Sequence, residues 1–96
     1  MLLLPPHLTL QEAPDTLRIF RQTLAKELKE AEVQRRLIVD GSALQRFDSC
    51  ALAVLLECRR QAQARGWSFA VRHLPAKLSD LARLYGVQSL LPAAAD

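Results

Sequence analysis

The sequence predicts an α/β domain in which helices pack on one side of a small mixed β-sheet. Apolar segments that alternate or run unbroken, as strands do, are interleaved with segments whose apolar residues recur at helical spacing. Helices separated by strands need a sheet to lie on. The 96 residues, 50% of them hydrophobic, are enough for one packed core and too few for two. We therefore expect a single domain over residues 1–96, with residues 92–96 fraying at its end.

Two short strands and one helix are expected at the start of the chain. Leu2 to Leu4 is a short apolar run that stops at two prolines, and His7 to Gln11 alternates polar and apolar side chains. Ala13-Pro14-Asp15 predicts the start of a helix, because proline fits the first turn and an acid there complements the helix dipole. The apolar stripe of this helix has spacings of three and four: Leu17, Phe20, Leu24 and Leu28.

The central strand is expected at Arg36 to Asp40. Its Leu37-Ile38-Val39 run is unbroken, which is typical of a strand buried on both faces of a sheet. A helix from Ser49 to Arg65 follows, and Gly66 suits the position just past its end. The predicted core residues of this helix are Leu52, Leu55, Leu56, Cys58 and Ala62.

A last strand and a third helix are expected in the C-terminal part. Trp67 to Arg72 alternates large apolar with small or polar side chains, as a strand does. Pro75 then opens a helix and Gly86 ends it. Val87 to Leu91 is either a closing strand or a final turn. The predicted core residues of the third helix are Leu78, Leu81, Ala82 and Tyr85.

Charge and composition argue against nucleic-acid binding and against membrane insertion. The 13 basic and 10 acidic side chains are interspersed, whereas a nucleic-acid binder gathers its basic residues on one face beside aromatic platforms. No apolar segment approaches the ~20 residues that span a bilayer, and Met1 to Leu4 is too short for the core of a signal peptide. We therefore expect a cytoplasmic protein that binds no nucleic acid and does not insert directly into a membrane.

The cysteines, histidines and glycines predict no metal site and no cofactor. Cys50 and Cys58 are expected to stay thiols in the cytosol, and on one helix their Cα atoms would lie about 12 Å apart, beyond disulfide reach. His7 and His73 are far from both in sequence, which matches no zinc-ligand spacing. With 3 glycines, the chain also lacks a phosphate-binding loop.

No catalytic residue is expected, so the chain is predicted not to be an enzyme. Asp40 and Asp48 are close enough in sequence to suggest an acid–base pair, but no histidine accompanies them at a useful position. Each has a simpler role, because Asp40 can start a turn at the end of a strand and Asp48 can cap the helix that follows. Cys50 has no identifiable base, and such cysteines are more often small core residues.

Ser49 stands out because it places a hydroxyl in the first turn of a helix whose other side is predicted to be buried. The exposed start of a helix carries free amides and about half a positive charge. It can therefore receive an acidic group of a partner, or hold a phosphate on the serine. The alternative is a serine that only helps to cap the helix.

The segment from Leu37 to Leu52 resembles the signature of STAS domains, a family named for sulfate transporters and anti-sigma-factor antagonists. The family pattern is an apolar strand, Asp, a small hydroxyl residue two positions on, and then Asp-Ser or Asp-Thr opening a helix. The order of strands and helices predicted along the chain also fits the fold of the family. The residues that match the pattern are Asp40, Ser42, Leu44, Phe47, Asp48, Ser49 and Leu52.

The chain departs from the STAS pattern at one position. Ala51 stands where the family usually carries glycine. Glycine permits a close approach of backbones, and the methyl group of alanine is expected to narrow the fit of a partner. A kinase that must bring its nucleotide to the serine would be hindered more than a partner that only docks.

Within the family, the chain is most similar to the small stand-alone subunits of Mla phospholipid-transport complexes. The similarity includes the run from Leu81 to Val87, followed by Leu90-Leu91-Pro92. It implies a non-enzymatic accessory subunit that binds and supports the ATPase of an ABC transporter involved in outer-membrane lipid asymmetry. Such a subunit would be cytoplasmic and peripheral to the inner membrane through its partner. The partner-binding residues are expected to be Ser49, Cys50, Phe47 and Asp48.

Two other interpretations of the resemblance are open. Ser49 matches the position that is phosphorylated in anti-sigma-factor antagonists, whose partner is an anti-sigma kinase. In that case the unmodified serine would permit binding and phosphorylation would release the partner. A regulatory domain related to those of anion transporters is a third interpretation, although the chain lacks any membrane portion.

Overall fold

The computed structural model describes residues 2–9, 13–30 and 34–94, without the side chains of residues 13–17, 19 and 20. Strands and helices alternate along the chain, so the predicted α/β class is confirmed. The elements are β1 (Leu2–Leu3), β2 (His7–Leu8), α1 (Ala13–Glu30), β3 (Arg36–Asp40), β4 (Arg46–Phe47), α2 (Ser49–Ala64), β5 (Ser68–Arg72), α3 (Ala76–Leu84) and the 3₁₀ helix η1 (Gln88–Leu90).

The strands form two parallel ladders. The main sheet has the order β1-β3-β5, and β2 and β4 form a second ladder in which Leu8 lies opposite Phe47. Pro5 and Pro6 separate β1 from β2, and proline has no N–H with which to continue a ladder. Within the described residues, the small mixed sheet expected from the sequence is therefore built from two ladders whose strand pairs are all parallel.

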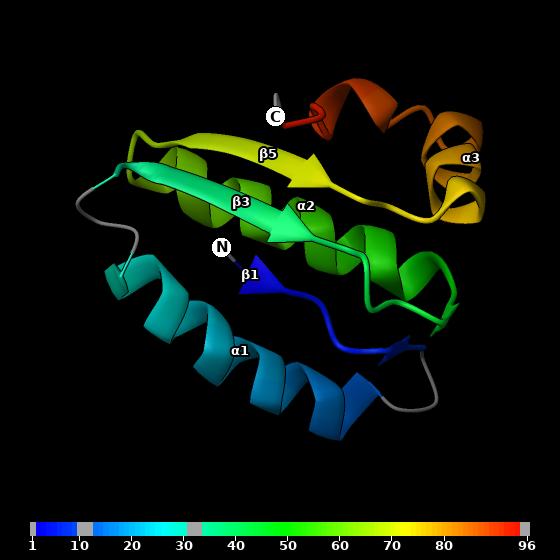
Figure 1. Ribbon diagram of the computed structural model, residues 1–96, viewed down its shortest axis with the longest axis horizontal. Coiled ribbons are helices and arrows are strands. Elements are labelled where there is room, and N and C mark those ends of the chain that lie inside the picture. Colours follow the sequence, from blue (N-terminus) through cyan, green and yellow to red (C-terminus); the bar gives the residue numbers. More distant parts are fainter. Residues whose placement is uncertain (1, 10–12, 31–33, 95–96) are drawn as a thin grey trace.

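The helices cover one face of the main sheet. α2 lies behind β3 and β5 and contacts both, while α1 and α3 flank α2 (Figure 1). The core forms where buried side chains of α2 meet Leu37, Val39 and Val71 of the strands. Ile38 faces the other way and is half-buried, and Leu3 on that same face is 54% exposed. The expected burial of β3 on both faces is therefore wrong, because α2 covers only one of them.

α2 begins at the predicted residue and ends one residue early. Arg65 is its C-cap, and Gly66 follows with a positive φ of 71° that glycine adopts without strain. Leu56, expected in the core, is half-buried. The other four predicted core residues, Leu52, Leu55, Cys58 and Ala62, are buried, and so are Ala51 and Val54, which were not predicted.

The N-terminal elements are present where the structure describes them, but both strands are shorter than predicted. Leu24 and Leu28 of the α1 stripe are buried, with 5% and 6% exposure. The side chains of Leu17 and Phe20, predicted in the same stripe, lie outside the described residues. The strand predicted over His7 to Gln11 is present as β2 but is shorter than expected, because it ends at Leu8 and Thr9 is outside it; Gln11 lies outside the described residues.

α3 places only part of its predicted stripe in the core. Leu78 and Ala82 are buried, and Leu81 is half-buried. Tyr85 was expected in the core but is 59% exposed. The reason is that α3 ends at Leu84, so Tyr85 is the C-cap and leaves the helical face that packs on α2.

The C-terminal segment pairs with the sheet. Residues 88–90 form a 3₁₀ turn, not a closing strand. Beyond it, the N–H of Val71 donates to the carbonyl of Pro92 at 2.8 Å, and the N–H of Ala94 donates to the carbonyl of Val71 at 2.7 Å. The expected fraying of residues 92–96 is therefore wrong for Pro92 to Ala94, because β5 has a free edge that their backbone satisfies; residues 95–96 lie outside the described part.

Candidate functional site

The start of α2 presents the hydroxyl group that the sequence singled out. Ser49 is the first residue of the helix and its side chain is exposed. Asp48 precedes it in an extended conformation, and its Oδ1 accepts a hydrogen bond from the N–H of Cys50 at 2.8 Å. The predicted role of Asp48 as the N-cap is confirmed. Because the cap uses Asp48, the serine hydroxyl is left facing solvent.

Phe47, two residues before Ser49, and Cys50, the residue after it, line different grooves. Phe47 belongs to β4, which Leu8 of β2 holds in place, and its half-buried ring packs against the core. Cys50 is half-buried on the first turn of α2. Phe47 lines a groove toward α3, whereas Cys50 lines a groove between α1 and α2. Ser49 therefore lies between a residue that lines one groove and a residue that lines the other.

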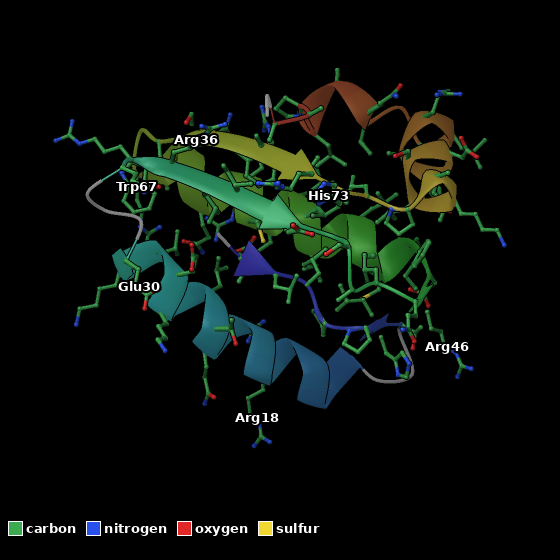
Figure 2. The ribbon with its side chains drawn as sticks, viewed as in Figure 1. Arg18, Glu30, Arg36, Arg46, Trp67 and His73 are labelled. Carbon is green, nitrogen blue, oxygen red and sulfur yellow. The ribbon has the colours of Figure 1, made fainter. Side chains whose placement is uncertain are left out.

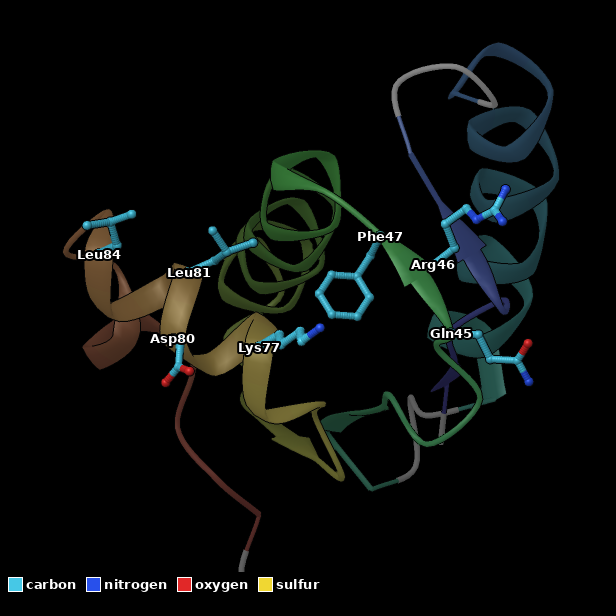
Figure 3. Close-up of a pocket in the computed structure, with 7 residues that line it drawn as sticks. All are labelled: Gln45, Arg46, Phe47, Lys77, Asp80, Leu81 and Leu84. Atoms are coloured by element: carbon cyan, nitrogen blue, oxygen red, sulfur yellow. The ribbon is translucent and has the colours of Figure 1, made fainter.

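The first groove, which we call the Phe47 groove, has a volume of about 540 Å³. Figure 3 shows the ring of Phe47 on one side, with Lys77 and Leu81 of α3 extending toward it. Gln45 and Arg46 extend away from α3, on the far side of β4 (Figure 3). The full lining is Gln45, Arg46, Phe47, Lys77, Asp80, Leu81 and Leu84.

The second groove, which we call the Cys50 groove, has a volume of about 560 Å³. Its apolar lining comes from both helices, and its polar lining includes Glu57 and Gln61. Glu57 accepts hydrogen bonds from Gln61 and from Arg60, which lies outside the lining. The hydrogen bonds from Arg60 and Gln61 lower the pKa of Glu57 to about 2. The lining residues are Arg21, Leu24, Ala25, Leu28, Cys50, Ala53, Val54, Glu57, Gln61 and Arg65.

The two thiols have the properties of packing residues. Burial raises the pKa of the Cys50 thiol, and the nearby charge of Asp48 raises it further. Burial raises the pKa of Cys58 to about 12. The thiolate is the nucleophilic form of cysteine, and it is scarce at neutral pH in both cases. Both cysteines lie on α2, as predicted, and both are free.

Asp40 lies at the end of β3 and joins two strand ends. It is 5% exposed, and its Oδ1 accepts a hydrogen bond from the N–H of Ser42 at 2.7 Å, which confirms the predicted turn. Its Oδ2 lies 3.3 Å from Nδ1 of His73 and 3.7 Å from Nε of Arg72. Burial by itself would raise the pKa of Asp40, but the hydrogen bonds from Ser42 and His73 outweigh it and the pKa is lowered.

The expectation that no histidine accompanies Asp40 or Asp48 is therefore wrong for Asp40. His73 is 33 positions away in the chain and is brought close by the parallel register in which Asp40 lies opposite Arg72. Figure 2 shows His73 at the edge of the sheet where β3 and β5 both end. Among the described side chains no nucleophile is hydrogen-bonded to His73, and the contact between His73 and Asp40 joins the ends of β3 and β5.

No group of at least three His, Cys, Asp or Glu side chains lies close enough to hold a metal ion within residues 2–9, 13–30 and 34–94. No helix in the same part of the chain is both long enough and apolar enough to cross a membrane.

Sequence reasoning missed the α3 side of the Phe47 groove. Lys77, Leu81 and Leu84 recur at spacings of four and three, which places them on one helical face. That spacing was available in the sequence, but Leu81 was assigned to the core and Leu84 to no role. Only the tertiary structure shows that this face of α3 borders the same groove as Phe47.

Ala51 needs a different explanation from the one the sequence suggested. Its exposure is 0%, and it belongs to the core cluster. Its methyl group therefore faces the interior, so the expectation that Ala51 narrows the fit of a partner is wrong. The helix turn that begins at Ser49 points position 51 inward.

Comparison with known proteins gives one match that covers most of the chain. A family model described as "Mlab, STAS domain" matches residues 6–92. The matched range contains the capped start of α2, both grooves and the Asp40 turn. No curated protein matches the chain.

Proposed function

Because the chain belongs to the STAS domain family, whose members are generally small non-enzymatic interaction domains, we propose that it is an accessory subunit of an ABC-type phospholipid transporter. In this role it binds the ATPase of the transporter and supports its assembly and activity. It works in the cytoplasm, peripheral to the inner membrane through the ATPase, and contributes to the lipid asymmetry of the outer membrane. It catalyses no reaction of its own.

The observation that carries this proposal is the exposed Ser49 at a capped helix start, between Phe47 and Cys50, which line two different grooves. A partner that contacts Ser49 can also reach one or both of these grooves. The first amides of α2 and the positive end of its dipole favour an acidic or polar group of the partner. The proposed interface consists of Ser49 and its neighbours Phe47, Asp48 and Cys50.

Co-expression with the transporter ATPase that is encoded next to this protein, followed by purification, tests the proposal. The ATPase is expected to co-purify with the wild-type protein and to lose at least tenfold in affinity, or about 1.4 kcal/mol, with Ser49→Arg. Ser68→Arg is the matched control, because Ser68 is also exposed but begins β5 at the opposite end of the sheet. Failure of the wild-type pair to co-purify would refute the proposed function, and equal binding by both variants would remove Ser49 from the interface.

The accessibility of Ser49 also favours a second candidate, an anti-sigma-factor antagonist controlled by phosphorylation of Ser49. A phosphate there adds about −1.5 to −2 charge at a helix start, where the dipole and free amides stabilise it. Incubation with candidate anti-sigma kinases and ATP, followed by mass spectrometry, tests this candidate. It predicts one added phosphate on Ser49 that is absent from Ser49→Ala, and an unmodified wild-type protein would exclude it.

A further inference from the structure

The Phe47 groove carries an apolar side chain that the fold of this domain does not use. Leu84 is 77% exposed, more than Tyr85 at 59% or Leu3 at 54%, the other exposed large apolar residues in the described part of the chain. Leu78 and Ala82 already supply the buried face of α3. Leu84 therefore does not serve the core, and it lines the groove as an exposed side chain.

The groove has two walls of known geometry. Lys77, Leu81 and Leu84 form one face of α3, and the ring of Phe47 lies across from them (Figure 3). From Lys77 to Leu84 the wall runs along the helix for about 10 Å, which is the length of roughly two helical turns. A second helix laid along α3 would place side chains at spacings of three or four into this groove.

Lys77 adds a positive charge that the domain itself does not balance. It lies in the first turn of α3, where the helix dipole is positive and a cation is not stabilised by it. No ion pair of Lys77 occurs among the described side chains. Asp80 extends away from the ring of Phe47, whereas Lys77 extends toward it (Figure 3). The groove therefore combines apolar walls with an ammonium group that lacks a partner carboxylate.

We propose that the Phe47 groove receives an acidic amphipathic helix of the partner ATPase. Apolar side chains of that helix pack between Phe47 and Leu84, and one of its carboxylates pairs with Lys77. The inference rests on the proposed function and names the chemistry of the partner at that interface. Because Phe47 directly precedes the cap of α2, the helix in the groove and the contact at Ser49 belong to one continuous surface.

The first experiment compares two adjacent exposed residues. Leu84→Asp is expected to weaken binding of the purified ATPase at least tenfold, whereas Tyr85→Asp changes it less than twofold, because only Leu84 lines the groove. Both side chains are exposed in the folded domain, so both variants should keep the wild-type circular dichroism spectrum and melting midpoint. Equal binding by the two variants would overturn the proposal, even if Ser49→Arg still abolishes binding.

The second experiment identifies the group that pairs with Lys77. The chain has three lysines, and Lys26 and Lys29 lie on α1. Zero-length carbodiimide cross-linking of the complex, followed by mass spectrometry, should join Lys77 to a Glu or Asp in an amphipathic helix of the ATPase. Lys77→Arg should remove that cross-link and keep the affinity.

Each remaining result counts against the proposal. Cross-links from Lys26 or Lys29 without any from Lys77 would place the ATPase on another face. A link from Lys77 to an acidic residue of a second copy of this chain would make the groove a self-association surface. If the wild-type protein does not bind the ATPase at all, the proposed function itself fails.

Discussion

Replacing Asp48 with alanine is expected to lower the free energy of unfolding by about 1 kcal/mol, within the roughly 0.5–2 kcal/mol typical of a lost N-cap. Oδ1 of Asp48 accepts the N–H of Cys50 at 2.8 Å, and the substitution leaves that N–H without its acceptor. The first turn of α2 has no acidic residue that could replace it. For a domain of this size, 1 kcal/mol corresponds to a fall of about 4–8 °C in melting midpoint.

Asp48→Asn separates the hydrogen bond from the charge. Asparagine caps helices about as well as aspartate, so this variant keeps the cap and loses only the charge–dipole interaction, worth about 0.3–1 kcal/mol. Urea unfolding followed by circular dichroism should rank the wild type first, Asp48→Asn second and Asp48→Ala last. Equal losses for the two variants would show that the hydrogen bond is not the stabilising contact, and a wild-type midpoint for Asp48→Ala would refute the capping argument.

Three other predictions concern stability and thiol reactivity. Because the folded state lowers the pKa of Asp40, its contribution to stability is present above its unfolded pKa and is lost as the pH falls through its folded value. In Asp40→Asn, the free energy of unfolding should therefore fall less steeply than in the wild type as the pH drops below about 4. The same pH dependence for both proteins, measured by urea unfolding at a series of pH values, would contradict this. Cys58, with a pKa of about 12, should resist iodoacetamide in the folded protein and react after unfolding. Half-buried Cys50 should react slowly in the folded protein, at neutral and at mildly alkaline pH. Equal labelling of the two cysteines in the folded protein, measured by peptide mass spectrometry, would be inconsistent with the burial of Cys58. Gly66→Ala should cost about 1–2 kcal/mol from backbone strain alone, because φ is 71° and an added Cβ meets no atom within 4 Å; a wild-type urea midpoint would show that the strain is absent.

Local signals in the sequence predicted the elements around the site well. β3 was predicted at its observed bounds from an unbroken apolar run, and α2 from its cap, its stripe and the glycine that follows it. These signals depend on residues within one or two turns of each other, so neighbouring side chains and backbone groups decide them. The exposure of Ser49 follows in the same way, since the cap and the buried stripe fix which side of the first turn faces solvent.

Contacts between distant segments were not predictable in the same way. The approach of His73 to Asp40 depends on the register of β3 and β5, and neither residue carries a local sign of the other. β4 has two residues, too few for a periodic pattern, and it was not predicted. The pairing of Ala93 with Val71 likewise requires a free sheet edge that only the assembled fold provides.

The sequence by itself determined the α/β class, the STAS-like signature and a capped helix that carries Ser49 at its start. The tertiary structure decided what surrounds that serine. Side-chain periodicity states which face of a helix is buried, but it does not state which other element lies beside the exposed face. The placement of α3 across a groove from β4, and of α1 beside α2, puts Phe47 and Cys50 on two separate grooves, and it is this placement that makes the exposed Leu84 part of the Phe47 groove.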